Sequence, residues 1–314
     1  MAKKRTKRTY RLRNWSEYNK ALVTRGSLTC WVSEDLLGAW LSTERTGRRG
    51  KPVAYTETAI LCMATLAEIY RLPLRATQGL LRSIMHLLRV ELSVPSYSTL
   101  CRRRQQLEVS LPRRGRREPL HLVVDATGVK VYGEGEWKVR QHGYSKRRTW
   151  RKLHLGVDEQ TGEVAAAVVA TNNFTDGQLL EALLEQIEGE LKQVTGDGAY
   201  DKRHCYEAIA GRGARAVIPP QKGARIWRHG NRKEERLARD ENVRRIRAVG
   251  RRQWKRESGY HRRSLAETTM FRLKTIFGAR VAARSFAGQA AEMLVRCAAL
   301  NRMTHLGMPD SYAV

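Results

Sequence analysis

The sequence predicts an α/β fold in which a mixed sheet with flanking helices follows a helical N-terminal region. Three observations lead to this prediction. Before residue 111, apolar residues recur at spacings of three and four, as they do in helices. After residue 120, runs rich in β-branched residues alternate with helical runs. Between the two, residues 112–119 are basic, contain two prolines and a glycine, and indicate a linker.

The helical region begins with two predicted helices. Apolar residues recur at helical spacing over residues 59–70, and Pro73 is expected to end that helix. A second helix is predicted over residues 80–88, where five apolar residues share one face.

A third helix is predicted over residues 97–107, with Ser96 as its N-cap. It carries Arg102, Arg103 and Arg104. A helix, a turn and a basic helix are the pattern of a helix-turn-helix domain, whose second helix lies in the DNA major groove. The alternative is a helical cap with a solvated basic face.

The second half of the chain supplies the sheet. A capping box formed by Thr175 and Gln178 is expected to begin a helical run over residues 179–187. The other elements predicted here are strands at residues 120–132, 153–158, 163–171, 193–197 and 214–218, and a helix at residues 202–209.

The net charge indicates a polyanionic partner. The chain of 314 residues has 59 Lys and Arg against 31 Asp and Glu, a formal charge of +28, and nucleic acid is the usual partner of such a surplus. The alternative is a basic structural protein without chemistry. Residues 212–263 carry 18 basic and 5 acidic residues, a local net of 18 − 5 = +13. Trp227 and Trp254 interleave with them, so this stretch is predicted to grip a nucleic-acid backbone.

The same composition excludes other classes. Seven of the first 13 residues are basic, but no apolar segment follows them, so no secretory signal is expected. No apolar run approaches the roughly 18–20 residues that a membrane span needs. We therefore expect a cytoplasmic protein. Cys205 and Cys297 fall on apolar helical faces and are predicted to be core residues.

Two aspartates stand at unusual places in predicted strands. Asp125 lies within a strand, where a buried charge is costly unless a cation lies beside it. Asp197 lies at a strand end between two glycines, which would let the backbone approach a ligand closely. Taken singly, each could equally be a residue bonded to backbone amides at a strand end or a tight turn.

Glu267 lies on a predicted helix with three other functional residues. If Glu267 is set at 0° and each residue adds about 100°, Tyr260, Arg263 and Lys274 all fall within an arc of about 60° around it. The alternative is an ordinary polar stripe with an Arg263–Glu267 pair four residues apart. Three carboxylates in a basic chain suit phosphodiester chemistry, because two Mg²⁺ ions take oxygen ligands and basic side chains hold phosphates.

These residues also carry a family resemblance. The string Tyr260-x2-Arg263-x3-Glu267-x6-Lys274 resembles the Y-R-E-K signature of the DDE insertion-sequence transposases. Val123–Thr127 and Gly196–Asp201 resemble the first and second aspartate blocks of that family. Residues 135–158, 72–81 and 94–100 are similar to its insertion-sequence-five branch, within the wider insertion-sequence-four-like superfamily.

The resemblance implies a ribonuclease-H-like catalytic domain at residues 120–280. It implies that Asp125, Asp197 and Glu267 hold two Mg²⁺ ions, for which Mn²⁺ is expected to substitute. Water would cleave the DNA at the element ends, and the freed 3′-hydroxyl would attack target DNA. Arg263 and Lys274 would contact phosphates, and Tyr260 would position the backbone. The short interval between Asp197 and Glu267 leaves no room for a large β-rich insertion, so no hairpin formation or base flipping is carried over.

The remaining predictions concern organisation and partners. We expect a basic arm at residues 1–27, a helical DNA-binding domain at 28–111, a linker at 112–119 and a C-terminal helical extension at 281–314. The partners expected are double-stranded DNA of the element ends and target, and further copies of the chain in a dimer or higher oligomer. The location implied is the bacterial nucleoid. The alternatives are an inactive transposase-derived DNA-binding regulator and a stand-alone nuclease.

A few other residues receive predictions. The loop residues Lys146, Arg147 and Arg148 are expected to contact phosphates, and His154 to pack in the core. The most direct interpretation of three further aspartates is as cap and turn residues: Asp158, Asp176 and Asp201.

Overall fold

The main sheet is mixed and has helices on both faces. The computed structural model describes residues 9–43, 54–114, 119–131, 150–228 and 237–314. The sheet has the strand order β4-β3-β2-β5-β6, and β7 also pairs with β2. Its strands are β2 (Leu120–Val131), β3 (Trp150–Asp158), β4 (Val164–Thr171), β5 (Leu191–Thr195), β6 (Arg215–Val217) and β7 (Arg280–Val281). Strand β3 is antiparallel to β2 and β4, whereas β5, β6 and β7 continue the sheet with parallel pairing. The α/β prediction is confirmed, and the arrangement is consistent with a ribonuclease-H-like fold.

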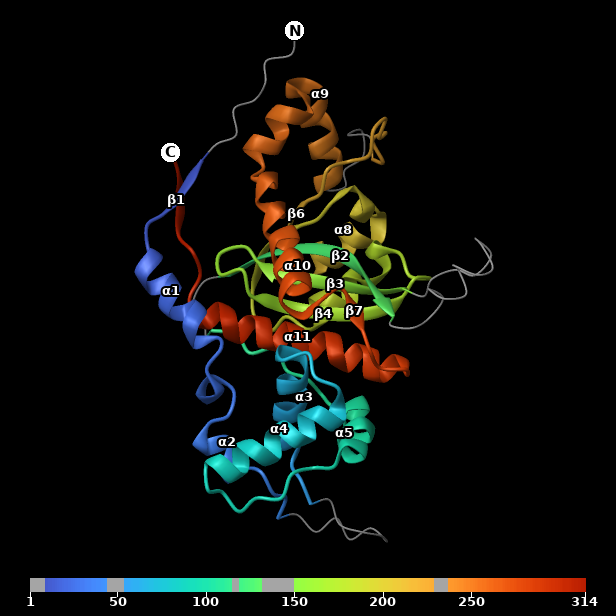
Figure 1. Cartoon of the computed structure of the whole chain (residues 1–314). Helices are drawn as coiled ribbons and strands as arrows, with labels where there is room; N and C mark the ends of the chain where they lie inside the picture. Colours follow the sequence, from blue (N-terminus) through green and yellow to red (C-terminus); the bar gives the residue numbers. More distant parts are fainter. Residues whose placement is uncertain (1–8, 44–53, 115–118, 132–149, 229–236) are drawn as a thin grey trace, which may run out of the picture.

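Alternation along β2 sends its side chains to two different cores. Leu122 and Val124 pack with α7 (Leu180–Glu185) and α8 (Arg203–Gly211) on one face. Val123 and Val129 point to the other face, which is covered by two longer helices (Figure 1). These are α10 (Ser264–Phe277) and α11 (Phe286–Leu306). Asp125 and Thr127 fall on this second face, between Val123 and Val129.

Helix α11 joins the sheet to the N-terminal helices. It lies between β4 and α3 (Glu57–Ile69), and its buried side chains share one core with both (Figure 1). Helix α3 begins where the Thr56 side chain accepts a hydrogen bond from the Ala59 N–H, and it ends before Pro73 as predicted. The other N-terminal elements are α1 (Trp15–Thr24), η1 (Leu28–Cys30), α2 (Glu34–Gly38), α4 (Leu74–Leu87), α5 (Tyr97–Arg103) and η2 (Arg104–Gln106). Helix α1 lies in the segment that the sequence assigns to a basic arm.

The predicted turn before the third helix is longer than a helix-turn-helix turn. The cap prediction for α5 is confirmed, because the Ser96 hydroxyl accepts a hydrogen bond from the Thr99 N–H at 3.2 Å. Residues 88–96 separate α4 from α5, whereas a helix-turn-helix motif uses about three to four residues. Only residues 70–73 separate α3 from α4. The three helices pack on one another, and a helix-turn-helix function remains a proposal.

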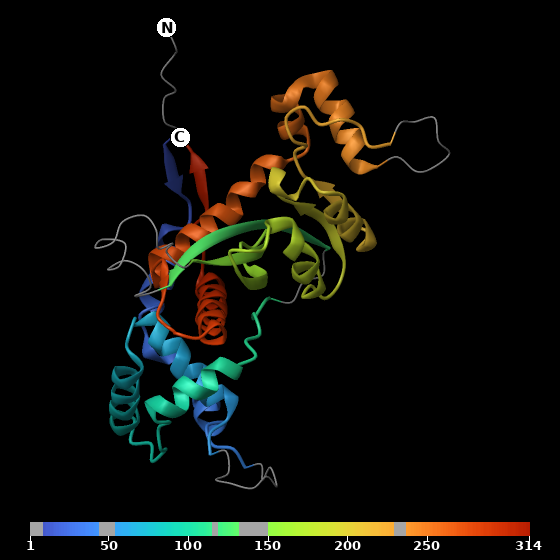
Figure 2. The same cartoon turned by 90° about the vertical axis from the view of Figure 1, so that its right-hand side faces the viewer.

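The other elements connect or extend this body. Three are 3₁₀ turns: η4 (Asp176–Leu179), η5 (Gly198–Tyr200) and η6 (Tyr260–Arg263). The predicted capping box of Thr175 and Gln178 is present at the start of η4. Helix α9 (Ala238–Glu257) is bent at Gly250, whose φ of 81° lies in the left-handed region that favours glycine. Figure 2 shows α9 projecting from the sheet.

Chain ends and core details complete the fold. Strands β1 (Tyr10–Leu12) and β8 (Ser311–Ala313) pair in a separate two-stranded sheet. Cys205 and Cys297 are buried, as predicted. Within the described ranges, no helix is both long enough and apolar enough to cross a membrane.

Candidate active site

Asp125 is held in the middle of β2 by backbone and side-chain partners. Its Oδ1 accepts a hydrogen bond from the Ala126 N–H at 2.9 Å, and its Oδ2 accepts one from Arg263 Nη1 at 3.1 Å. Its side chain is 17% exposed. Burial raises the pKa of this carboxyl, and the charges of Asp197 and Glu267 raise it further, against the opposing effects of Ala126 N–H and Arg263. This partly buried strand aspartate therefore has the cation that the sequence led us to expect.

Asp197 lies beside Asp125, at the point where the neighbouring strand β5 ends. Val123 of β2 is aligned with Thr195 of the parallel strand β5, and the two aspartates each follow two residues later. Because neighbouring strands lie about 4.8 Å apart, this register places the two aspartates side by side. Asp197 also caps η5, because its Oδ1 accepts a hydrogen bond from the Ala199 N–H at 2.9 Å.

The glycine before Asp197 serves packing rather than the close ligand approach that the sequence suggested. A Cβ added to Gly196 would lie 2.9 Å from Tyr200 Cδ2 and 3.1 Å from Val124 Cγ2. No real Cβ approaches a ring carbon so closely, so only glycine fits between the strand and the buried Tyr200. Gly196 thus allows the chain to pass close to Tyr200 directly before Asp197.

Helix α10 brings the third carboxylate over the sheet. Its apolar face packs into the core through Ala266, Met270 and Leu273, which leaves Glu267 in the first turn with a 53% exposed side chain. Arg263 Nη2 donates a hydrogen bond to Glu267 Oε1. The Arg263 guanidinium therefore contacts Asp125 and Glu267 at once and joins β2 to α10.

Tyr260 lies near the same carboxylates. The Tyr260 pKa is raised by burial first, and then by the charges of Asp197, Asp125 and Glu267, while Arg263 acts in the opposite direction. Tyr260 packs against Trp254, with ring centroids 6.0 Å apart.

Lys274 reaches the sheet through a threonine that sequence reasoning did not select. Its Nζ donates a hydrogen bond to Thr127 Oγ1 at 2.6 Å, and burial lowers the pKa of the ammonium. The signal that could have found Thr127 is its place two residues after Asp125, on the same face of the strand.

One part of the helical argument was wrong. The sequence analysis placed Tyr260, Arg263, Glu267 and Lys274 on one α-helix, but Tyr260 to Arg263 form the 3₁₀ turn η6 and α10 begins at Ser264. Gly259, with a φ of 71°, precedes that turn. Tyr260 therefore reaches the site from a separate turn and not from the helix that carries Glu267.

Asp201 lies apart from the carboxylates and organises the start of α9. Its Oδ1 accepts hydrogen bonds from Arg239 Nε at 2.9 Å and from the Tyr206 hydroxyl at 3.2 Å, and its Oδ2 accepts one from the Gln221 N–H at 2.9 Å. Both Asp201 and Arg239 are buried. Sequence reasoning read Asp201 as a cap or turn residue and missed this ion pair, because Arg239 is 38 residues away.

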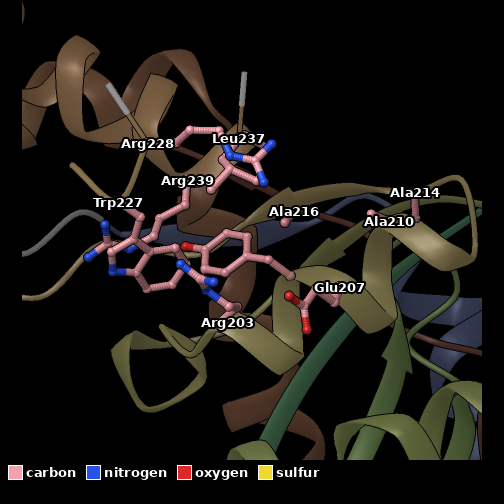
Figure 3. A pocket seen from close by; sticks show the side chains of 11 residues that line it. Arg203, Glu207, Ala210, Ala214, Ala216, Trp227, Arg228, Leu237 and Arg239 are labelled. Atoms are coloured by element: carbon pink, nitrogen blue, oxygen red, sulfur yellow. The ribbon is translucent and has the colours of Figure 1, made fainter. Parts of the chain in front are cut away.

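The two tryptophans of the basic stretch differ in their surroundings. Trp254 is 3% exposed and donates a hydrogen bond from Nε1 to Asn242 Oδ1 at 3.1 Å. Trp227 lies beneath the Arg239 guanidinium, which is 3.8 Å from its ring centroid, at a cavity of about 330 Å³ between α8 and α9 (Figure 3). The prediction that both rings interleave with a gripping surface was wrong for Trp254. The basic residues that α9 exposes are Arg245, Arg247, Arg252 and Arg256.

The three arginines of the third helix differ in their surroundings. Arg104 Nη1 bonds Glu292 Oε1 at 3.0 Å, with both side chains largely buried, and Arg103 donates a hydrogen bond to the Tyr55 carbonyl. Arg102 is exposed. Of the three, Arg102 is placed to meet a ligand at the surface. Lys146, Arg147 and Arg148 lie outside the described residues.

The carboxylates fit a divalent cation in their chemistry. They offer hard oxygen ligands, and the pKa of Asp125 is raised first by burial and then by the charges of Asp197 and Glu267, an effect that a nearby cation would oppose. In the described part of the chain, no three His, Cys, Asp or Glu side chains lie close enough together to hold a metal ion. The cation between Asp125 and Glu267 in this structure is the Arg263 guanidinium.

Comparison with known proteins gives two family matches. A family model described as a transposase DDE domain matches residues 116–302, more than half of the chain. A second model with the same description matches residues 23–134. Among solved structures, the chain is similar to a cryo-EM structure of a piggyBac transposase synaptic complex with hairpin DNA, at 9% identity and a TM-score of 0.35. That match covers 96% of this chain and 78% of the other.

Proposed function

The chain belongs to the family of proteins with a transposase DDE domain, and on this premise we propose that it is an insertion-sequence transposase. It would bind the terminal inverted repeats of its element, cleave phosphodiester bonds at the ends and transfer the 3′-hydroxyl strands to target DNA. The insertion-sequence-five family and the Y-R-E-K signature belong to this proposal.

The observation that carries the proposal is the convergence of three carboxylates from three separate elements. Asp125 comes from β2, Asp197 from the end of β5 and Glu267 from α10. Burial and then the charges of Asp197 and Glu267 raise the pKa of Asp125, and the Arg263 guanidinium links Asp125 to Glu267. Such a group of carboxylates beside the end of β5 supports metal-assisted phosphoryl chemistry.

Asp125, Asp197 and Glu267 would hold two Mg²⁺ ions, with Mn²⁺ as a substitute. Bound there, the ions would supply Lewis-acid stabilisation to the attacking and leaving oxygens of an in-line displacement. Arg263 would then exchange its carboxylate partners for a DNA phosphate, since guanidinium groups bind both in the same bidentate manner. Lys274 would hold a second phosphate, and Tyr260 would position the backbone.

Basic surfaces outside the site support binding along the duplex. Arg102 on α5 and the exposed arginines of α9 would neutralise phosphates, as would Lys146, Arg147 and Arg148. Each such contact steepens the log–log salt dependence of binding by roughly 0.9, so DNA affinity should fall steeply as salt rises. Bringing two ends together requires a dimer or higher oligomer. The location proposed is the cytoplasm, at the nucleoid.

The test uses DNA that carries the gene's own flanking sequences. The purified chain is incubated with this fragment and Mg²⁺, and cleavage and strand joining are mapped, with Glu267→Gln as the matched control. Cleavage and joining at the flanks that are absent in Glu267→Gln support the proposal. Specific binding without cleavage in Mg²⁺ or Mn²⁺ would favour a DNA-binding regulator. Cleavage without joining or preference for ends would favour a nuclease.

A further inference from the structure

One aromatic side chain on α10 projects from the helix with nothing packed over it. Phe271 is 70% exposed, the most exposed aromatic side chain in the part of the chain that the structure describes. The opposite face of α10 packs into the core through Ala266, Met270 and Leu273. The ring therefore contributes little to this packing.

Phe271 lies on the same face of α10 as Glu267. Four residues separate them, which places Phe271 about 6 Å further along the helix axis and rotated by about 40°. The exposed residues on this face around Phe271 are Thr268 and Thr275, which are too small to cover a phenyl ring. Lys274 lies about 60° from Phe271 on the other side and turns inward to Thr127. The ring is thus uncovered and lies about one helical turn from Glu267.

A single exposed apolar residue is common on protein surfaces, so exposure alone would not single out Phe271. Its place one turn from Glu267 does. If the proposed function holds, DNA must approach Glu267 closely for the phosphodiester bond to react. A phenyl ring on that face then meets DNA rather than water.

The chemistry of DNA limits what the ring can bind. Inside a duplex the apolar base faces are covered by stacking, and they become available where a strand ends or a base leaves the stack. Cleavage beside Glu267 would create such an end about one helical turn from Phe271. We propose that Phe271 stacks on the terminal base pair of the cut DNA end and holds this end at the carboxylates for strand transfer. This inference rests on the proposed function, and it adds a contact that would position the cut DNA end.

The experiment first maps where the wild-type chain cuts its flanking DNA. Two duplexes of equal length are then compared for binding: one that stops at the mapped position, and one that runs through it. The variants are Phe271→Ala, Phe271→Leu and Phe271→Tyr. The matched control is Thr275→Ala, one turn further along the same face. Thermal unfolding is followed for each variant.

Stacking predicts that Phe271→Ala and Phe271→Leu bind the cut end about tenfold more weakly, while Phe271→Tyr and Thr275→Ala bind it as the wild type does. Binding of the uninterrupted duplex should change less than about threefold, because that duplex presents no base face. Unfolding temperatures should stay within about one degree, because the ring packs on little. Strand joining should fall with the affinity for the cut end.

Two results would overturn the inference while leaving the proposed function intact. One is cleavage by the wild type with cut-end binding unchanged in Phe271→Ala. The other is full retention by Phe271→Leu, which would show a general apolar contact and no stacking. Absence of cleavage by the wild type would instead remove the proposed function, and the inference with it.

Discussion

Arg263 donates a hydrogen bond to Asp125 across 138 residues of sequence, with Nη1 and Oδ2 3.1 Å apart. The same guanidinium donates to Glu267. Arg263 therefore neutralises part of the charge that burial makes costly at Asp125, and it fixes the start of α10 over the centre of β2. A metal ion that binds these carboxylates must compete with this guanidinium.

Replacing Arg263 should strengthen metal binding in the absence of DNA. In Arg263→Ala the carboxylates lose their cation, so we expect about tenfold tighter binding of Tb³⁺, measured by luminescence. Arg263→Lys keeps the positive charge and should change the affinity less. Equal Tb³⁺ affinity in wild type and Arg263→Ala would show that the guanidinium does not compete with a metal.

Replacing Asp125 with asparagine should stabilise the fold at neutral pH. The folded-state pKa of Asp125 is raised, so its proton favours the folded state. The stability that this proton contributes is fully present below the unfolded pKa and is lost as pH rises through the folded pKa. Asp125→Asn removes this loss, so its melting temperature should exceed that of the wild type by a few degrees at pH 7. The difference should shrink as the pH falls towards 4. A lower melting temperature at pH 7 would mean that the Arg263 pair outweighs burial.

Asp201 should act on stability rather than on chemistry. Breaking a buried ion pair leaves a buried charge without its partner, which costs about 3–5 kcal/mol. We therefore expect Asp201→Asn to lower the free energy of unfolding in urea by about that amount, while the folded fraction cleaves DNA at the wild-type rate. Loss of cleavage in a stably folded Asp201→Asn protein would place Asp201 in the site after all.

Arg102 near the end of α5 and Arg104 at the start of η2 should separate binding from folding. Arg102 is exposed, so Arg102→Ala should weaken DNA binding and reduce its salt dependence without changing the melting temperature. Arg104 pairs with the buried Glu292, so Arg104→Ala should lower the melting temperature. If both variants lower the melting temperature and leave DNA binding unchanged, this face of α5 does not contact DNA.

Local signals were enough to predict most of the elements. The strands of the sheet follow from runs of β-branched residues, and the caps at Ser96 and Thr175 follow from hydroxyl side chains that accept backbone hydrogen bonds. Helix α1 was missed because only Ala21 of that helix is buried, so its sequence carries a weak apolar period. Helix α9 and its bend at Gly250 were both missed, because basic residues dominate that segment and hide an apolar period, and a single glycine does not disclose its φ.

The site residues that stand out by residue type and local position were predictable from the sequence. Those whose role depends on contacts with residues far away in the sequence were not. Asp125, Asp197 and Glu267 stand out by residue type at a strand or helix position. The 3₁₀ turn at Tyr260 depends on a left-handed Gly259, and the Arg239–Asp201 pair depends on how α9 packs. Thr127 belongs to the site only because Lys274, from α10, donates a hydrogen bond to it. Contacts of this kind depend on tertiary structure and leave no local pattern in the sequence.

The most direct test of the central claim measures the cleavage rate constant of three amide variants on the flanking-sequence fragment. Asp125→Asn, Asp197→Asn and Glu267→Gln keep the shape of each side chain and remove its charge. The matched control is Glu181→Gln, on α7 at the opposite face of the sheet. We predict that each of the three lowers cleavage by about a thousandfold or more while DNA affinity stays within about threefold, and that the control cleaves normally. Cleavage within tenfold of the wild-type rate by any of the three would show that its carboxylate does not belong to the reacting site.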